Sequence, residues 1–304
     1  MQSPSPASVE ALATPPAPAV RRVVTIRPAK GWQAVPWREL WEYRDLVVMF
    51  AMRDVMVRYK QAVLGVAWAL LQPAAQVLVF TVFFGVMLGV SSRVPPIDGR
   101  PVPYAVFAMA GTVVWNFFAA GVTGGSNSLL ANADILRKIY MPRLVMPLAA
   151  FGAPLMDGAV AFGLLLGAMA WYGVPMGPAM LLTPLWALSA VASALGVSLF
   201  LAALTVSYRD FKYVVPFMVQ TLFFITPVIF PRDIVPERYS HLAWLLDLNP
   251  MSGVITAFRA SVLGAPLTPE VWASFAISST VGLVALVGGL LYFTSVERRF
   301  ADVA

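Results

Sequence analysis

Long uncharged stretches dominate the chain. Asp, Glu, Lys and Arg are absent from residues 61–92, 101–133, 213–231 and 271–296, and residues 144–208 contain Asp157 alone. An α-helix crosses a bilayer with about 20 apolar residues. The turn at 172–178, which contains Gly and Pro, divides the longest stretch in two. The pattern therefore predicts six transmembrane helices, near residues 62–90, 103–126, 144–171, 179–206, 212–230 and 270–295.

Residues 37–60 alternate between apolar and charged side chains. Apolar positions such as Leu40 and Val47 recur at helical spacing, while Arg38 and Glu42 stand among the charged positions between them. The segment is too charged to span a bilayer. We therefore expect an amphipathic helix that lies in the cytoplasmic interface of the membrane.

Residues 232–265 lie between the last two predicted spans and could form a seventh. Asp247, Asn249-Pro250 and Arg259 break the apolar pattern there. Two short re-entrant helices on the outer side fit better than a full span. Such backbone is tolerated at membrane depth only where protein or a water-filled cavity covers it.

Composition supports a membrane protein. The chain is 59% hydrophobic and 12% charged, with a mean hydropathy of +0.76, whereas soluble domains carry about 25% charged residues. We expect an all-α polytopic fold. The absence of Cys and the single His241 exclude a thiolate site, a disulfide framework and a His-rich metal site.

The two ends of the chain differ from its middle. Residues 1–36 are rich in Pro, Ala and Ser near their start and carry no signal-peptide pattern, so we expect a disordered cytoplasmic tail. Residues 61–297 would form the transmembrane domain. Residues 298–304 would be a cytoplasmic C-terminus.

Basic residues orient the predicted spans. Lys and Arg concentrate in the N-terminal region up to Lys60, in the loops 131–143 and 207–213, and at Arg298-Arg299. Cytoplasmic loops carry such an excess, so both termini are expected inside. A seventh span would place Arg298 and Arg299 outside, which argues against it. Fewer basic residues fall on the other side, namely Arg93, Arg100, Arg232, Arg238 and Arg259.

The sequence contains no G-x-x-x-x-G-K-[ST] phosphate-binding loop, so energy for active transport would come from a partner or an ion gradient. The glycines at 121, 124 and 125 indicate close helix packing. Asp157 is a candidate functional acid because it is isolated in a span. A packing role beside Pro154 is an equal alternative, and no span offers a basic partner.

The loop at 126–147 contains a short helix pattern. Asn132 or Asp134 can cap it, and Pro142 ends it. The apolar residues Ile135, Leu136, Ile139 and Tyr140 could form one face while Arg137 and Lys138 face water. Such a helix could dock into a groove on a soluble partner, or it could be an ordinary loop helix with positive-inside charges.

Four segments carry a family resemblance: "RYKQAVLGVAWALLQP", "NADILRKIYMPRLVMPL", "SYRDFKYVVPFMVQTLFFITPVIFP" and "LNPMSGVITAFRASVLG". In this order and position they resemble the permease subunits of ABC transporters that export polysaccharides, a group that includes O-antigen, teichoic-acid and capsule exporters. The likeness runs from about Trp41 to Arg299. The first segment is closer to the O-antigen type.

The resemblance implies an assembly in a bacterial inner membrane. It implies a homodimer with a path between the protomers, together with two copies of a separate ATPase that binds ATP and Mg. Residues 132–141 would form the coupling helix that enters the ATPase, and 37–60 the interfacial gate helix. Residues 232–265 would cap the outer exit. No nucleic-acid partner is implied.

The basic cluster at the start of the first span also gains a meaning from the resemblance. Arg53, Arg58 and Lys60, with Trp41, would meet the phosphate of a lipid-linked glycan at the inner leaflet, because cations form charge-assisted hydrogen bonds with phosphate. Positive-inside anchoring alone would also explain these charges. Gln72 could satisfy backbone groups that Pro73 frees.

Aromatic residues are dense in the predicted spans, and sugar rings stack on aromatic faces. We expect some of these residues to line a translocation path, although most membrane aromatics serve packing. The candidates for the path are Phe83, Phe84, Trp115 and Phe118, together with Asp157.

The function that follows is the permease half of an ATP-driven exporter of a lipid-linked, O-antigen-like polysaccharide, with no catalytic residue of its own. The same architecture could instead export a capsule polymer, teichoic acid, or a small lipid or drug. A membrane-embedded glycan-modifying enzyme would need a cluster of outward-facing acids or His residues, and the sequence shows only scattered ones.

Overall fold

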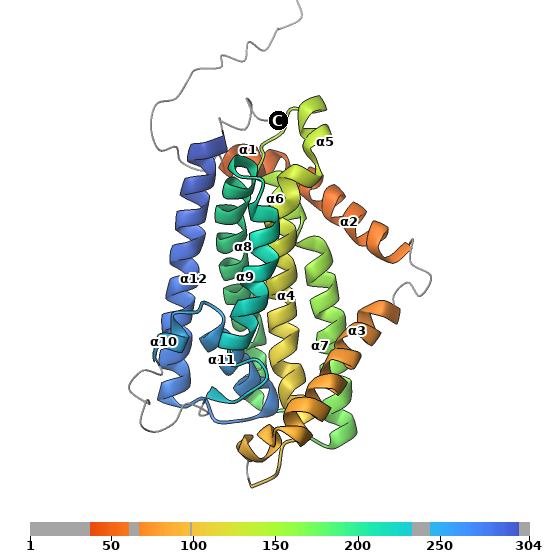
Figure 1. Cartoon of the computed structure of the whole chain (residues 1–304), viewed down its shortest axis with the longest axis vertical. Coiled ribbons are helices and arrows are strands. Elements are labelled where there is room, and N and C mark those ends of the chain that lie inside the picture. The colour runs from red at the N-terminus through yellow and green to blue at the C-terminus, as the bar shows by residue number, and fades with distance from the viewer. Residues whose placement is uncertain (1–36, 61–66, 98, 233–243, 298–304) are drawn as a thin grey trace, which may run out of the picture. The chain divides into compact units, whose positions relative to one another are not determined.

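The computed structural model of the chain describes residues 37–60, 67–97, 99–232 and 244–297. These residues form helices and no strand, and they belong to one unit that covers residues 32–304 (Figure 1). The expected all-α class is confirmed for this part of the chain. The predicted tail and C-terminal segment, residues 1–36 and 298–304, lie outside it.

Five helical segments of the described chain are long and apolar enough to cross a membrane. Each coincides with a predicted span, which confirms those five predictions. They are α3 (Ala67–Phe80) with the π-helical η3 (Thr81–Met87), α4 (Tyr104–Ala131), α6 (Val145–Ala149) with α7 (Gly152–Tyr172), η5 (Pro178–Leu182) with α8 (Thr183–Ser207), and α12 (Pro269–Val296).

The predicted span at 212–230 is shorter in the structure. Its helix, α9 (Phe211–Ile225), has 15 residues, which is about 22 Å at 1.5 Å per residue against a hydrocarbon core of about 30 Å. Thr226 is extended because the residue before a proline, here Pro227, disfavours the helical conformation. The expected helix therefore ends well before Phe230.

The long helices run alternately up and down (Figure 1). The short α5 (Ala133–Lys138), the connection between α8 and α9, and the carboxyl end of α12 lie at one end of the bundle. The start of α4 and the two short helices α10 (Trp244–Asp247) and α11 (Ser252–Leu263) lie toward the other. The loops rich in basic residues therefore share one end.

The N-terminal segment forms two helices where one was predicted. They are α1 (Trp37–Glu42) and α2 (Arg44–Lys60), with a break at Tyr43. Phe50 is the buried residue of α2 and packs into a cluster with residues of α4, α6 and α8. Gly152 at the start of α7 lets α2 come close, because a Cβ there would lie 2.6 Å from Cβ of Ala51.

Two short helices occupy the described part of 232–265, as the sequence predicts, and they are separated at residues 248–251. Buried Asp247 accepts hydrogen bonds from Arg232 and Ser274, each at 2.5 Å. Buried Arg259 donates to the carbonyl oxygens of Pro227 at 3.0 Å and Val228 at 2.5 Å. These bonds tie α10 and α11 to α12 and to the irregular segment after α9, where they satisfy two backbone carbonyl oxygens.

Small residues let the spans pack at backbone contact. A Cβ on Gly289 of α12 would lie 2.3 Å from the carbonyl oxygen of Gly196 in α8. Likewise a Cβ on Gly121 or Gly125 would lie within 2.8 Å of Phe151 or Ser198, respectively. The packing interpretation is confirmed for Gly121 and Gly125, since helices in a membrane associate through such small positions.

We expect Gly289→Ala to destabilise the protein by about 1–3 kcal/mol, because the new methyl group overpacks the contact between α8 and α12. Gly288→Ala is the matched control, since a Cβ there meets nothing within 4 Å. Thermal unfolding of the two purified variants in the same detergent measures the difference. Equal midpoints would contradict the tight contact.

The direction of the helices can be tested by cysteine labelling, because the natural chain has no Cys. Single Ile97→Cys and Pro175→Cys variants should react with an impermeant maleimide added outside spheroplasts. Asp210→Cys should react only after the membrane is broken. External labelling at position 210 would overturn the topology in which the connection between α8 and α9 lies in the cytoplasm.

Candidate functional site

Helix α2 borders two adjoining cavities. The first, which we call the Arg53 cavity, has a volume of about 400 Å³ and also contacts Asp54 and Asn132. The second, the Asp157 cavity, has a volume of about 460 Å³ and lies between α2, α3, α4 and α7. Arg58 lines both. These cavities bring together most of the polar residues that the sequence singles out on α2 and α7.

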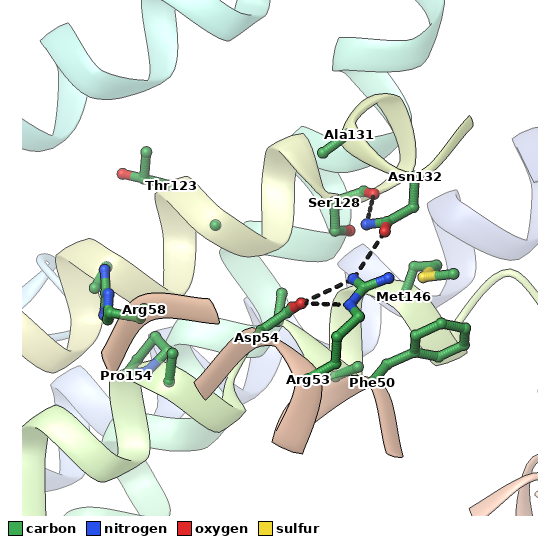
Figure 2. Close-up of a pocket in the computed structure, with 15 residues that line it drawn as sticks. Phe50, Arg53, Asp54, Arg58, Thr123, Ser128, Ala131, Asn132, Met146 and Pro154 are labelled. Atoms are coloured by element: carbon green, nitrogen blue, oxygen red, sulfur yellow. Dashed lines mark hydrogen bonds and ion pairs between the residues drawn. The ribbon is translucent and has the colours of Figure 1, made fainter. Parts of the chain in front are cut away.

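In the Arg53 cavity the guanidinium group binds Asp54 and Asn132 (Figure 2). Nε and Nη2 of Arg53 donate to Oδ1 of Asp54 at 3.0 and 2.8 Å, and Nη2 also donates to Oδ1 of Asn132 at 2.9 Å. The guanidinium carbon lies 4.9 Å from the ring centroid of Phe50. Arg53 therefore connects α2 to the junction between α4 and α5.

Asn132 serves this connection and does not cap α5 with its side chain. It occupies the N-cap position, but no side-chain cap hydrogen bond forms. Its amide nitrogen donates to the carbonyl oxygen of Ser128 at 2.9 Å (Figure 2), and its backbone carbonyl accepts from Ile135 and Leu136. The expected capping role of Asn132 is therefore wrong, because Arg53 and Ser128 take both ends of the amide.

In the Asp157 cavity the isolated acid has two partners. Oδ2 of Asp157 accepts a hydrogen bond and ion pair from Nη1 of Arg58, and Oδ1 accepts from the Tyr59 hydroxyl. Burial, then the hydrogen bond to Asp157, raise the pKa of Tyr59 to about 12, so it stays a donor at neutral pH. The basic partner that no span supplies comes from α2.

The opposite wall of the Asp157 cavity is polar and aromatic. Gln72, Trp68 and Asn116 line it, and Nδ2 of Asn116 donates to Oε1 of Gln76 at 2.8 Å. A guanidinium–carboxylate pair, amides and an indole ring thus share one partly open space. This set of groups can bind an anionic headgroup with an attached apolar or sugar portion.

The two arginines of the predicted basic cluster are paired with carboxylates. Arg53 pairs with Asp54, and Arg58 pairs with Asp157. These four groups together add no net charge to the cavities. Lys60 is exposed at the carboxyl end of α2. Trp41 lies in α1 with 69% of its surface exposed and contacts the guanidinium of Arg44, so it lies outside both cavities.

The candidate path aromatics fall into two groups. Trp115 and Phe118 are 3% and 2% exposed and pack against each other with ring centroids 5.4 Å apart, so in this conformation they face the core and no open path. Phe83 is about half exposed, and Phe84 is partly buried with its ring at an edge-to-face angle to Phe80. The density of aromatics in the sequence does not distinguish these environments.

Helix α5 covers 133–138 and is shorter than the expected 132–141 because Ile139 is extended. Asp134, Arg137 and Lys138 are exposed, and so is Tyr140 beyond the helix. Ile135 and Leu136 are partly buried against the cluster that contains Phe50. The expected single apolar face is therefore split, with two residues packed inward and Ile139 and Tyr140 exposed.

The segment after α5 is fixed to the end of α12. Nη1 of Arg143 donates to the carbonyl oxygen of Glu297 at 2.6 Å, and the Arg143 backbone N–H donates to Oε1 of Glu297 at 3.2 Å. Burial raises the pKa of Glu297 and lowers that of Arg143. A cavity of about 310 Å³ lies here, bordered also by Glu39 of α1.

Residues 45–263 match the ABC-2 type transporter family, well over half of the chain. The chain belongs to the ABC-2 type transporter family. The resemblance to ABC permease subunits is thereby confirmed, and the chain is a multi-pass transport protein.

This ABC-2 transporter is similar to proteins named for O-antigen export and for polysialic acid transport. It is 28% identical over 272 residues to the O-antigen export system permease protein RfbA of Klebsiella pneumoniae, covering 85% of this chain and 95% of the relative. It is 27% identical to the protein of the same name in Myxococcus xanthus, covering 87% of this chain and 97% of that relative. The polysialic acid transport protein KpsM of Escherichia coli is 24% identical, covering 83% and 93%.

Proposed function

We propose that this ABC-2 transporter is the membrane subunit of an ATP-driven exporter that moves a lipid-linked, O-antigen-like polysaccharide out of the bacterial cytoplasm. The observation that carries the proposal is the similarity to O-antigen export permeases along nearly their whole length. The cavities beside α2, with their arginines, suit a phosphate-bearing lipid carrier.

The working assembly would contain two copies of this chain and two copies of a separate ATPase with ATP and Mg. The sequence lacks a phosphate-binding loop, which favours a partner as the source of energy. The first span, α3 with η3, supports a second copy, because many of its large apolar side chains, including Leu78 of α3 and Val86 of η3, are exposed in one chain. Such a face needs lipid or another subunit.

In the proposed topology α9 and the segment that follows it form a sixth crossing of the inner membrane. Both termini then lie in the cytoplasm, at the end that carries α5. Helices α10 and α11 lie toward the other end (Figure 1), where they would form the re-entrant cap of the outer exit. The hydrogen bonds from Arg259 to two carbonyl oxygens of the segment after α9 support this position at membrane depth.

Helix α2 would act as the gate helix at the inner leaflet. It exposes Val48, Met52 and Met56, which suits contact with lipid, and it presents Arg53 and Arg58 to the cavities. Lys60 and Trp41 would contact the lipid carrier outside the cavities, at the membrane surface. Phe83, on the exposed face, is the best placed of the aromatic candidates to meet the substrate.

Export of a capsule polymer is the second candidate. The similarity to KpsM favours it, at lower identity than the similarity to the O-antigen permeases. The two candidates share the architecture and differ in the lipid carrier.

We propose α5 and its flanks as the coupling element for the ATPase. Arg137→Glu with Lys138→Glu should uncouple ATP hydrolysis from transport, because both side chains are exposed at the end of α5 and available to a partner. The measurement is ATPase activity and glycan export of the purified complex, with export falling about tenfold or more. Normal export with normal ATPase binding would contradict the assignment.

Ile135→Ser with Leu136→Ser makes a contrasting pair. Both side chains pack inward, so we expect loss of thermal stability along with loss of coupling. The exposed Tyr140→Ala variant should weaken ATPase binding and leave the unfolding midpoint of the isolated permease unchanged.

The cargo is tested by glycolipid analysis of cells that lack this chain. We expect a glycan on polyprenyl diphosphate to accumulate in the inner leaflet, and mass spectrometry of extracted lipids identifies it. A glycan on a different lipid would move the protein to the capsule or teichoic-acid class. No accumulation, in a strain that makes the glycan, would remove the polysaccharide as cargo.

A further inference from the structure

A single carboxylate of α7 accepts two hydrogen bonds from side chains of α2. Asp157 is the one charged residue in the sequence from 144 to 208, and both of its oxygens are used by neighbouring residues of α2, Arg58 and Tyr59. The Arg58 and Asp157 side chains are 48% and 35% exposed, and the pair lines a cavity of about 460 Å³. A ligand in that cavity therefore has access to the pair.

Arg58 and Arg53 differ in how firmly they are held. Arg53 makes three hydrogen bonds, two of them to the adjacent residue Asp54 of its own helix. Arg58 has a single charged partner among the described residues, and that partner lies on another helix. Its guanidinium has donors to spare for a second acceptor, because Arg carries five N–H groups.

A phosphate group would compete directly with Asp157 for Arg58. It presents several anionic oxygens in the geometry that guanidinium binds in a bidentate manner, and a diphosphate carries more charge than one carboxylate. Once Arg58 turns away, Asp157 would be left charged in an apolar helix, which is costly unless another donor remains. Tyr59 is that donor, since its hydroxyl bonds the other carboxylate oxygen.

We propose that Arg58 exchanges Asp157 for the phosphate of a lipid-linked substrate, so that Asp157 sets the affinity of the Asp157 cavity for an anionic lipid headgroup. Tyr59 keeps the carboxylate hydrogen-bonded after the exchange. Asp157 is thus a competitor of the substrate, and it selects headgroups whose charge exceeds its own. The inference rests on the proposed function in that the ligand is a lipid-linked phosphate.

The exchange predicts opposite effects for the two members of one ion pair. Asp157→Asn should tighten the binding of undecaprenyl diphosphate several-fold, and Arg58→Gln should weaken it about tenfold, the effect of losing one charge-assisted hydrogen bond. Tyr59→Phe should weaken the binding of undecaprenyl diphosphate about threefold. Without the Tyr59 hydroxyl, Asp157 keeps Arg58 as its remaining hydrogen-bond donor and holds it more strongly against the phosphate. A purely structural ion pair predicts weakening in both Asp157→Asn and Arg58→Gln.

The test uses the full chain, co-purified with its partner ATPase, in phosphatidylcholine nanodiscs. Radiolabelled undecaprenyl diphosphate is titrated, with undecaprenol as the probe that lacks phosphate. Asp45→Asn and Arg38→Gln are the matched controls, since both residues form exposed ion pairs away from the cavities. Both controls should bind as the natural chain does, and no variant should alter undecaprenol binding.

A competition arm separates the two sources of lipid phosphate. Phosphatidylglycerol nanodiscs should leave the affinity for undecaprenyl diphosphate within about twofold. Equal competition by phosphatidylglycerol would overturn the assignment to a lipid-linked substrate. A change of the same sign in Asp157→Asn and Arg58→Gln would overturn the exchange itself.

The outcome is also separable from the proposed function. The exchange is supported if Asp157→Asn tightens binding and Arg58→Gln weakens it. If deletion of the same protein causes no glycan to accumulate, the polysaccharide cargo is removed while the exchange stands. Conversely, if glycan accumulates in the deletion strain and both variants change the affinity in the same direction, the cargo is supported and the exchange is overturned. If Asp157→Asn does not assemble with the ATPase, Tyr59→Phe supplies the decision. Weaker binding of undecaprenyl diphosphate with unchanged undecaprenol binding supports the exchange, and unchanged binding of both probes overturns it.

Discussion

The structure depends on the need to satisfy polar groups inside an apolar layer. Water is absent from the core of a bilayer, so each carboxylate, guanidinium or free backbone carbonyl must find a partner within the protein. Asp157 finds Arg58 and Tyr59, and the carbonyls after α9 find Arg259. These pairings decide where α2 lies on α7 and where α11 lies against the end of α9.

Helix α2 connects the two proposed working parts of the transporter. Its Arg53 contacts Asn132, directly before α5, and its Arg58 contacts Asp157 in the second cavity. Four residues of one helix therefore separate Arg53, which contacts the proposed coupling element, from Arg58 at the proposed substrate site. A displacement of α5 would act on the substrate site through a rigid segment of less than two turns.

The sequence predicts much of the fold because bilayer thickness imposes a length and a composition on each span. The five long helices follow from uncharged stretches, and Gly121 and Gly125 are recognisable as packing positions. The short α9 was missed because its apolar run continues to Pro231, beyond the helix end at Ile225. Hydropathy measures apolarity and does not register the conformational restriction before Pro227.

The candidate site was harder to predict because its contacts are distant in sequence. Arg58 and Asp157 are 99 residues apart, and Arg53 and Asn132 are 79 apart. A local pattern identifies an isolated acid and a basic cluster, but it cannot pair them. For the same reason the sequence groups Trp115 and Phe118 with the half-exposed Phe83, although Trp115 packs against Phe223 of α9 and Phe118 packs against Trp115.

Burial is distributed unevenly between the first two spans. In the most apolar 18-residue window, 72% of α4 is buried within the chain, against 11% for the span that contains α3. In a bilayer, displacing a helix costs the packing contacts that it makes with neighbouring helices, since lipid tails are as apolar as its side chains. Within one protomer α4 thus has far more packing contacts to lose than α3, and both helices line the Asp157 cavity.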